Sequence, residues 1–287
     1  MPDLIEIAKG LLESKEVSFI IGYTKDRFGR VKPYIAKSVE DANNLMFDHH
    51  SIHNLAVYLT RLKIPENGRV GIVAKSCDIK AIIALIQENQ IKREQVYIIG
   101  MNCSGVVTHS TDEWKKENIQ IKCKYCADKA PMLYDAVAGT AEPFEQPDDT
   151  QEVLMQKLET MSSAERWDFW AKEFEKCIKC YACRQVCPMC YCEQCLAEKN
   201  QPQWITTSPT PAGNFSWNII KAFHMAGRCV GCHECERACP MGIPLTLLTR
   251  KMGMVAGKEF NYRHGMAIDQ PTLVGSYNFN DNEDFIK

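Results

Sequence analysis

Residues 177–188 read Cys-Ile-Lys-Cys-Tyr-Ala-Cys-Arg-Gln-Val-Cys-Pro, and residues 229–240 read Cys-Val-Gly-Cys-His-Glu-Cys-Glu-Arg-Ala-Cys-Pro. Both stretches have the pattern C-x2-C-x2-C-x3-C-P, and each cysteine of the second lies 52 residues after its counterpart in the first. Three cysteines spaced three residues apart let one tight loop hold three corners of an iron–sulfur cubane. The fourth cysteine, which precedes a proline, ligates the other cluster of the pair. The pattern therefore predicts two [4Fe-4S] clusters with crossed ligation.

Crossed ligation assigns four thiolates to each cluster. The first cysteine set is Cys177, Cys180, Cys183 and Cys239, and the second cysteine set is Cys187, Cys229, Cys232 and Cys235. Zinc is a weaker explanation, because its sites normally use two C-x2-C pairs or cysteine with histidine. Disulfides would need an oxidising compartment.

The paired runs resemble the dicluster ferredoxin modules of heterodisulfide reductase small subunits and anaerobic sulfite reductase A subunits. The Ile-Pro-Leu segment at residues 243–245 supports this resemblance. The chain departs from those modules at Tyr181 and His233, where a glycine often follows the second cysteine. We expect this departure to change local packing and not ligation.

Three further cysteines follow the first run, at Cys190, Cys192 and Cys195. One explanation is free thiols packed beside a cluster, because free cysteine is readily buried. The other is an additional metal centre held by these three thiols, with His224 as a candidate fourth ligand. The sequence leaves both explanations open.

The overall composition narrows the class of protein. The chain has 287 residues, of which 15 are cysteine, and its N-terminus lacks the charge pattern of a signal peptide. We therefore expect a cytoplasmic protein whose thiols bind metal. The formal net charge of -2 removes the electrostatic basis for bulk nucleic-acid binding. No apolar run approaches the roughly 18 residues that a membrane span needs.

The distribution of the cysteines divides the chain. Four occur in the first half and eleven after residue 176, with an acidic, proline-containing stretch at residues 142–149 between the groups. We expect an α/β domain over residues 1–150, a mainly α-helical dicluster domain over residues 151–268, and a polar tail over residues 269–287. The alternative is that the acidic stretch is a surface loop within one domain.

The first half alternates between helical and strand patterns. Apolar residues at helical spacing predict helices over residues 4–12, 52–62 and 79–85. Apolar, β-branched runs predict strands at residues 17–21, 69–74 and 96–100. Ser51 is a candidate cap for the second helix. The last two strands and the helix between them predict a parallel pair with a right-handed crossover. The turn at residues 75–77 lacks the glycine-rich dinucleotide fingerprint, which argues against an ordinary nicotinamide site.

The second half is expected to be helical between its cysteine runs. Ser162 and Glu165 match a capping box at the start of a helix that carries Trp167, Trp170 and Phe174. A second helix is expected over residues 217–223.

The N-terminal cysteine set consists of Cys77, Cys103, Cys123 and Cys126. Cys77 is expected at the start of a helix and Cys103 just after the next strand, so both should lie at the C-terminal edge of the parallel strands. A helix start also favours the thiolate, and Cys123 and Cys126 add a C-x2-C pair. We expect a further [4Fe-4S] cluster or a zinc ion here, with unrelated buried thiols as the alternative.

These segments resemble the core of deazaflavin-reducing hydrogenase and formate dehydrogenase beta subunits. The resemblance covers roughly residues 15–140. It rests on residues 70–78, on residues 99–103 and on the C-x2-C at residues 123–128, which is followed by an acid two residues on. It implies one [4Fe-4S] cluster on the N-terminal cysteine set and a FAD beside it, which would exchange hydride with a soluble two-electron carrier.

Within this resemblance, Ser76 is the one candidate cofactor-binding residue. Asp48, His49 and His50 could line a flavin pocket, although cap and loop residues of this kind are more often simply exposed. The chain departs from the family in two ways, because its ferredoxin module follows the core and its core is shorter after the C-x2-C.

We therefore expect an iron–sulfur electron-transfer subunit of an anaerobic oxidoreductase complex, with three [4Fe-4S] clusters and no catalytic residue of its own. The expected partners are a hydrogenase, formate dehydrogenase or NAD(P)H module on one side and a heterodisulfide-reductase-like flavoprotein on the other. Two alternatives remain. One is a flavin-containing subunit that reacts directly with a deazaflavin or nicotinamide, and the other is an adaptor with a structural zinc in its first domain.

Overall fold

The computed structural model describes residues 3–65, 68–139 and 150–280. The acidic stretch at residues 142–149, where the sequence predicts a domain boundary, lies outside the described residues. So do residues 281–287 of the expected polar tail.

The chain divides into two compact units. The N-terminal unit comprises Met1–Asp149 and Gly265–Gln270, and the C-terminal unit comprises Thr150–His264 and Pro271–Lys287. Gln87 holds the returning segment in the N-terminal unit, because its side-chain amide donates to the carbonyls of Ala267 and Gln270 over 2.8 Å each.

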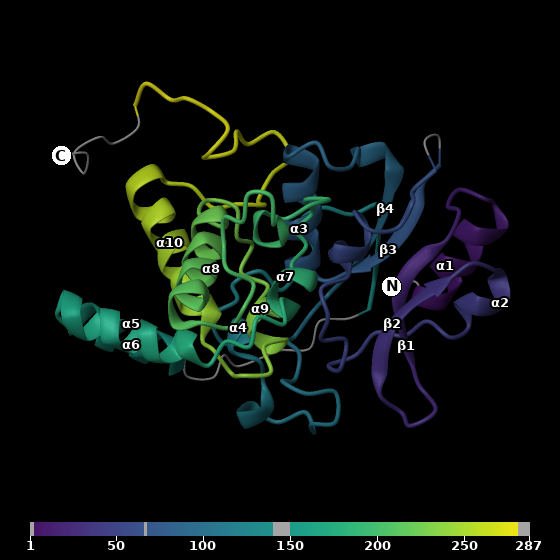
Figure 1. Ribbon diagram of the computed structural model, residues 1–287. Helices are drawn as coiled ribbons and strands as arrows, with labels where there is room; N and C mark the ends of the chain where they lie inside the picture. The colour runs from purple at the N-terminus through teal and green to yellow at the C-terminus, as the bar shows by residue number, and fades with distance from the viewer. Residues whose placement is uncertain (1–2, 66–67, 140–149, 281–287) are drawn as a thin grey trace. The chain divides into compact units, whose positions relative to one another are not determined.

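The N-terminal unit is built on a five-stranded sheet with the order β2-β1-β3-β4-β5 (Figure 1). The strands are β1 (Ile20–Lys25), β2 (Val31–Ala36), β3 (Val70–Ala74), β4 (Val96–Met101) and β5 (Ala136–Ala138). β1 and β2 form an antiparallel hairpin, and the remaining pairs are parallel. The expected α/β fold with parallel strands is confirmed.

Two of the expected strands form where the apolar runs predict them. β3 and β4 pair in parallel, with Val70 opposite Val96. The strand expected at residues 17–21 instead begins at Ile20 and continues to Lys25. It is longer at its polar end because β2 pairs with it up to Lys25, and the apolar pattern does not reveal that partner.

The helices of the N-terminal unit lie between and beside these strands. They are α1 (Leu4–Glu13), α2 (Val39–Ala42), α3 (Ser76–Gln87) and α4 (Ile121–Lys124), with 3-10 turns η1 (Leu55–Tyr58), η2 (Arg93–Gln95) and η3 (Lys116–Asn118). α1 and α3 contain the helices expected at residues 4–12 and 79–85.

The helix expected over residues 52–62 is wrong, since only the short turn η1 forms there. Asn54 caps it by accepting from the N–H of Ala56 over 3.1 Å, whereas the hydroxyl of Ser51 accepts from the N–H of Asp48. The N–H of Leu55 donates to the carboxylate of Asp78 on α3. This tertiary contact holds the segment as a turn.

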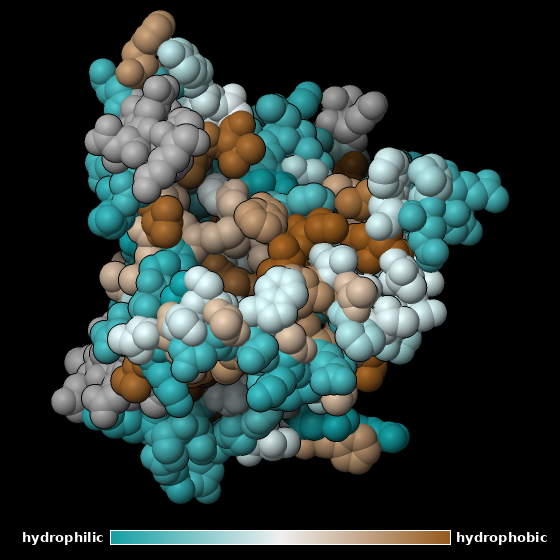
Figure 2. Space-filling view, turned by 60° about the vertical axis from the view of Figure 1, so that its left-hand side comes forward, coloured by the Kyte–Doolittle hydropathy of each residue, from teal (hydrophilic) through white to brown (hydrophobic). Residues whose placement is uncertain are grey.

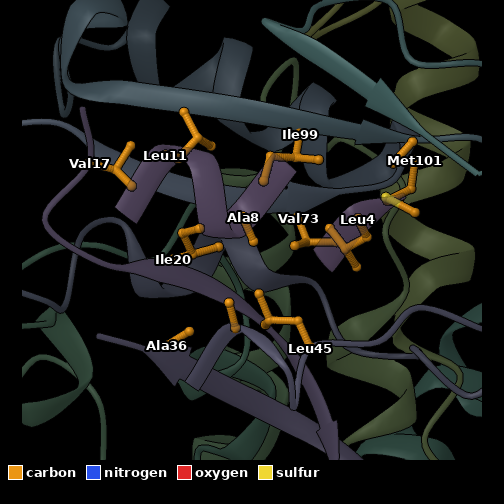
Figure 3. Close-up of a cluster of buried hydrophobic side chains, with 12 residues drawn as sticks. Leu4, Ala8, Leu11, Val17, Ile20, Ala36, Leu45, Val73, Ile99 and Met101 are labelled. Carbon is orange, nitrogen blue, oxygen red and sulfur yellow. The ribbon is translucent and has the colours of Figure 1, made fainter. Parts of the chain in front are cut away.

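The apolar face of α1 packs against the sheet, as Figure 3 shows. Leu4, Ala8 and Leu11 recur at helical spacing on this face and are buried with Val73 of β3 and Ile99 of β4. Burying a leucine side chain contributes about 1.5–3 kcal/mol. This cluster therefore fixes β3 and β4, the strands that lead to Cys77 and Cys103.

The C-terminal unit is helical among its described residues (Figure 1). Its elements are α5 (Thr150–Thr160), α6 (Ser163–Glu175), α7 (Ala182–Gln185), η4 (Leu196–Glu198), α8 (Pro211–His224), α9 (Glu234–Arg237) and α10 (Leu245–Phe260). The expected capping box is confirmed, since the hydroxyl of Ser162 accepts from the N–H of Glu165 and the carboxylate of Glu165 accepts from the N–H of Ser162. α8 contains the second expected helix.

The surface is mixed in character. Figure 2 shows a face on which hydrophilic residues predominate and hydrophobic residues are exposed among them. Over the described ranges, no helix combines the length and the apolar character that crossing a membrane requires.

Candidate iron–sulfur sites

The N-terminal cysteine set lies where neighbouring parallel strands end. β3 ends at Ala74 and α3 begins at Ser76, so Cys77 occupies the first turn of α3. Cys103 follows the end of β4, and its N–H donates to the carbonyl of Lys129 over 3.0 Å. Cys123 belongs to α4, and Cys126 follows that helix. The sheet therefore delivers two of the four thiols, and the loop around α4 delivers the others.

The four thiols are near enough to interact electrostatically. Cys77 interacts with Cys103, which in turn interacts with Cys123 and Cys126. The N–H of Val106 donates to the sulfur of Cys123 over 3.4 Å. The folded chain thus brings together all four cysteines of this set, although Cys103, Cys123 and Cys126 follow Cys77 by 26 to 49 residues in the sequence.

Burial controls the protonation of these thiols. It raises the pKa of Cys77 to about 12 and that of Cys103 to about 11, and it also raises the pKa of Cys123. The positive charges of Lys75 and Lys122 oppose the rise at Cys77 but are outweighed. The helix start favours the thiolate at Cys77, but desolvation outweighs it while no cation is bound. Binding a cation would supply the missing compensation.

A buried lysine, which the sequence reasoning missed, organises the start of α3. Lys75 is 1 % exposed, and its ammonium donates to the carboxylate of Asp78 and the hydroxyl of Tyr23, each over 2.9 Å, and to the carbonyl of His53. The backbone N–H of Lys75 donates to the same carboxylate. This network fixes the turn that holds Cys77. The sequence does carry a signal for this network, because Lys75 and Asp78 flank Cys77 between an apolar strand and an apolar helix.

Two further lysines contact this site. Lys80 on α3 forms an ion pair with Asp128, the acid that follows the C-x2-C. Lys122 is buried in α4, and its ammonium donates to the carbonyl of Ile52 over 3.4 Å while interacting with Cys77. Lys75, Lys80 and Lys122 thus lie around the N-terminal set, the first two each paired with an aspartate, and an ammonium near the thiols suits a group ligated by several thiolates.

Ser76 has a local hydrogen-bonding role in the structure. Its side chain is buried, and its hydroxyl donates to the carbonyl of Ala130 over 2.9 Å. It thereby ties the start of α3 to the segment after the C-x2-C.

The two histidines singled out before η1 pack against the segment that joins Cys103 to Cys123. The ring of His49 stacks on Trp114 at a centroid distance of 3.7 Å, and its Nδ1 lies 3.3 Å from the carbonyl oxygen of Gly105. Nε2 of His50 lies 2.9 Å from the carbonyl oxygen of Asp112. Both rings are half-buried. Asp48 accepts from the N–H of His50.

The two cysteine runs of the C-terminal unit share one backbone conformation. Tyr181 and His233, at equivalent positions, both have a φ of 56° in the left-handed region. Lys179 and Gly231, two residues earlier in each run, are left-handed as well. The short helices α7 and α9 then begin at equivalent residues. The sequence repeat is therefore a structural repeat, and a residue with a side chain adopts the left-handed conformation after the second cysteine of each run.

The two sets defined by crossed ligation also come together in the structure. In the first set, Cys183 interacts with Cys177, Cys180 and Cys239. In the second set, Cys187 interacts with Cys229, Cys232 and Cys235. Burial raises the pKa of Cys183 to about 11, and it raises the pKa values of the last three cysteines as well. Each run thus contributes its fourth cysteine to the neighbourhood of the other run.

Helix α8 supports the first run through side chains that the sequence reasoning also missed. The amide of Asn214 donates to the carbonyl of Cys177 over 2.7 Å, and Trp217 meets Tyr181 edge-on at a centroid distance of 5.0 Å. The buried ammonium of Lys179 donates to the carbonyl of Gly213 at the start of α8. Polar residues within the apolar stretch of a helix next to a cysteine run are the signal for such contacts.

The three additional cysteines lie in different surroundings. Cys190 is beside Cys187, and the hydrogen bond between the two thiols lowers the pKa of Cys187 to about 6 and raises that of Cys190. Cys192 is exposed, and Cys195 lies near Tyr181 and Arg184. His224 is exposed.

The donor chemistry of the three main sets fits iron–sulfur clusters. Each set offers four thiols and no carboxylate or imidazole ligand, and thiolates are the usual ligands of these clusters. Within the part of the chain that the structure describes, no three His, Cys, Asp or Glu side chains converge on a position for a single metal ion. A cubane is larger than one ion and has separate corners for its ligands.

Comparison with known proteins agrees with this chemistry. Residues 176–244 match the family model of a 4Fe-4S dicluster domain. The chain is 24 % identical to the F420-dependent formate dehydrogenase subunit beta of Methanocaldococcus jannaschii, over 92 % of this chain and 92 % of the relative. It is also 24 % identical to the F420-dependent formate dehydrogenase 1 subunit beta of Methanococcus maripaludis, over 73 % of this chain and 76 % of the relative.

These similarities define the class first: this chain is an iron–sulfur protein with a 4Fe-4S dicluster domain in its C-terminal unit. More particularly, it is similar to a formate dehydrogenase beta subunit over nearly its whole length. Both parts of the resemblance drawn from the sequence, the beta-subunit core and the fused ferredoxin module, are confirmed.

Proposed function

We propose that this protein is the iron–sulfur electron-transfer subunit of a formate dehydrogenase-type oxidoreductase complex. The observation that supports this most directly is the grouping of the first and second cysteine sets, which lie within the residues matched by the dicluster family model. Two clusters in one small unit suit one-electron transfer, because their redox chemistry needs only geometry and a suitable dielectric from the protein.

We propose three [4Fe-4S] clusters in all. The first and second cysteine sets each hold one, and the N-terminal set holds the third. The convergence of the four thiols and the positive charges of Lys75 and Lys122 support a cluster there, since a nearby ammonium stabilises a negatively charged group. The protein would then conduct electrons between its partner subunits.

The partner subunits follow from the same proposal. The relatives carry the name of subunits of formate dehydrogenase, so a formate dehydrogenase module is one proposed partner. A heterodisulfide-reductase-like flavoprotein as the other partner, and a cytoplasmic location, stay predictions from the sequence.

A count of bound elements tests the proposal. Protein purified without oxygen should contain about twelve iron and twelve sulfide per chain, with paramagnetic signals after dithionite treatment. A content of about eight iron atoms and one zinc atom per chain would indicate that the N-terminal set binds a structural zinc and not a third cluster. Protein without iron would refute the proposal as a whole.

A second function is favoured by the names of the relatives, both of which are F420-dependent. In this alternative, the subunit binds FAD near the N-terminal set and itself reacts with a deazaflavin. Flavin released by acid from the purified protein, together with anaerobic bleaching of that flavin by reduced F420, would establish it. If the protein contains no flavin and still passes electrons to an artificial acceptor, the result would support electron transfer and exclude the direct reaction with a deazaflavin.

The additional cysteines are tested separately. Cys192→Ser removes the exposed member of the three. An unchanged iron content and an unchanged spectrum would assign these residues to packed thiols, and a loss of iron would assign them to a further centre.

A further inference from the structure

Helix α8 presents one face to both cysteine sets of the C-terminal unit. Near its start, the side chain of Asn214 donates to the carbonyl of Cys177, which belongs to the first set. Just beyond its end, the sulfur of Met225 lies 3.9 Å from the sulfur of Cys187, which belongs to the second set. Residues seven apart lie on the same face of a helix. Lys221 therefore shares the face of Asn214 and lies between the two contacts.

Lys221 is buried on this face, with 7 % of its surface exposed. Its ammonium interacts with Cys183 of the first set and with Cys187 and Cys235 of the second. Placing an ammonium in a protein interior is costly unless negative charge lies close to it. The cysteines of the two sets, as thiolates, are negative charges of this kind.

We propose that Lys221 is a positive charge shared by the two clusters of the C-terminal unit, and that it raises the reduction potential of both. The inference rests on the proposed function, because it presupposes clusters on these two sets. Reduction adds one negative charge to a site that already carries thiolates, so a nearby ammonium stabilises the reduced state. The effect is strong because burial limits screening by water and salt. Lys221 acts on the clusters through space and is not a ligand.

The test is a potentiometric titration of the full chain, followed by electron paramagnetic resonance. The variants are Lys221→Met, which removes the charge at similar volume, and Lys221→Arg, which keeps it. Cys183→Ser and Cys235→Ser identify the reduction steps that belong to the two clusters. Lys221→Met should keep the iron and sulfide content and shift both steps to more negative potentials, and Lys221→Arg should retain the potentials of the unmodified protein.

Arg228→Gln is the matched control. Its guanidinium interacts with Cys187, which belongs to the second set alone. Only the step of the second cluster should shift in this variant, whereas both should shift in Lys221→Met. Unchanged potentials in Lys221→Met, or a shift of one cluster only, would overturn the proposal.

If Lys221→Met loses iron, Asn218→Asp decides the question. Asn218 is buried on the same face of α8, one turn before Lys221, and the substitution preserves its shape while adding a negative charge. Both potentials should fall, and unchanged potentials would overturn the inference. Absence of the two clusters from the unmodified protein would instead refute the proposed function, so the two failures are distinguishable.

Discussion

The ammonium of Lys80 and the carboxylate of Asp128 form an ion pair that joins helix α3 to the segment after the C-x2-C. Cys77 lies one turn before Lys80 on the same helix, and the thiol of Cys126 donates to the carbonyl of Asp128 over 3.4 Å. The ion pair therefore fastens two separate parts of the N-terminal cysteine set to each other. It also gives a structural role to the acid that the family resemblance singled out.

Breaking this ion pair should loosen the N-terminal cluster. Asp128→Asn leaves the ammonium of Lys80, whose side chain is 10 % exposed, without its charged partner, at a cost of about 1–3 kcal/mol. We expect faster loss of about four of the iron atoms to a chelator. Lys115→Met is the control, because the pair of Lys115 with Glu113 is exposed and should contribute little. Equal rates of iron loss in the two variants would contradict the proposed role.

Removing Cys77 should remove one cluster and leave the others. Cys77→Ala deletes a ligand from the N-terminal set, so the purified variant should contain about four fewer iron atoms per chain. The paramagnetic signals of the dicluster domain should persist. Iron content equal to that of the unmodified protein would show that Cys77 is not a ligand.

Tyr181 should tolerate glycine better than valine. Its left-handed backbone costs a residue with a side chain about 1–2 kcal/mol. Glycine removes that strain but loses the contact with Trp217, worth about 0.5–1.5 kcal/mol, so Tyr181→Gly should change the melting temperature little. Valine loses the same contact and keeps the strain, so Tyr181→Val should melt at a lower temperature. Both variants should retain their clusters, and equal melting temperatures would argue against backbone strain at this position.

Substitution of Gly265 by alanine should destabilise the protein, whereas the same substitution at Gly253 should not. Gly265 has a φ of 73°, and an added Cβ would collide with the backbone carbonyl of Lys80. Gly265→Ala should therefore destabilise the N-terminal unit by about 1–3 kcal/mol, measured as a lower denaturant midpoint. Gly253 lies within α10 with open space around it, so Gly253→Ala should stabilise the protein by roughly 0.5–1 kcal/mol. A harmless Gly265→Ala would show that the returning segment is not held against Lys80.

Patterns that are local in the sequence were sufficient to predict the class of site and much of the fold. Cysteine spacing is sufficient for the dicluster pattern, because a cubane is held by short loops whose ligands are close in sequence. The strands β3 and β4 and the helices α1, α3, α6 and α8 are likewise local in origin, since each buries an apolar run or face of its own.

The surroundings of the thiols depend instead on contacts between segments that are distant in the sequence. Residues 52–62 resemble a helix in sequence, but a hydrogen bond from Leu55 to Asp78 holds η1 as a turn. In the sequence, Lys75 and Lys221 look like ordinary polar residues. In the folded chain both are buried, Lys75 near the N-terminal set and Lys221 near cysteines of both runs. Burial and long-range charge are properties of the folded chain, and these two properties set the pKa values of the thiols and would tune the clusters.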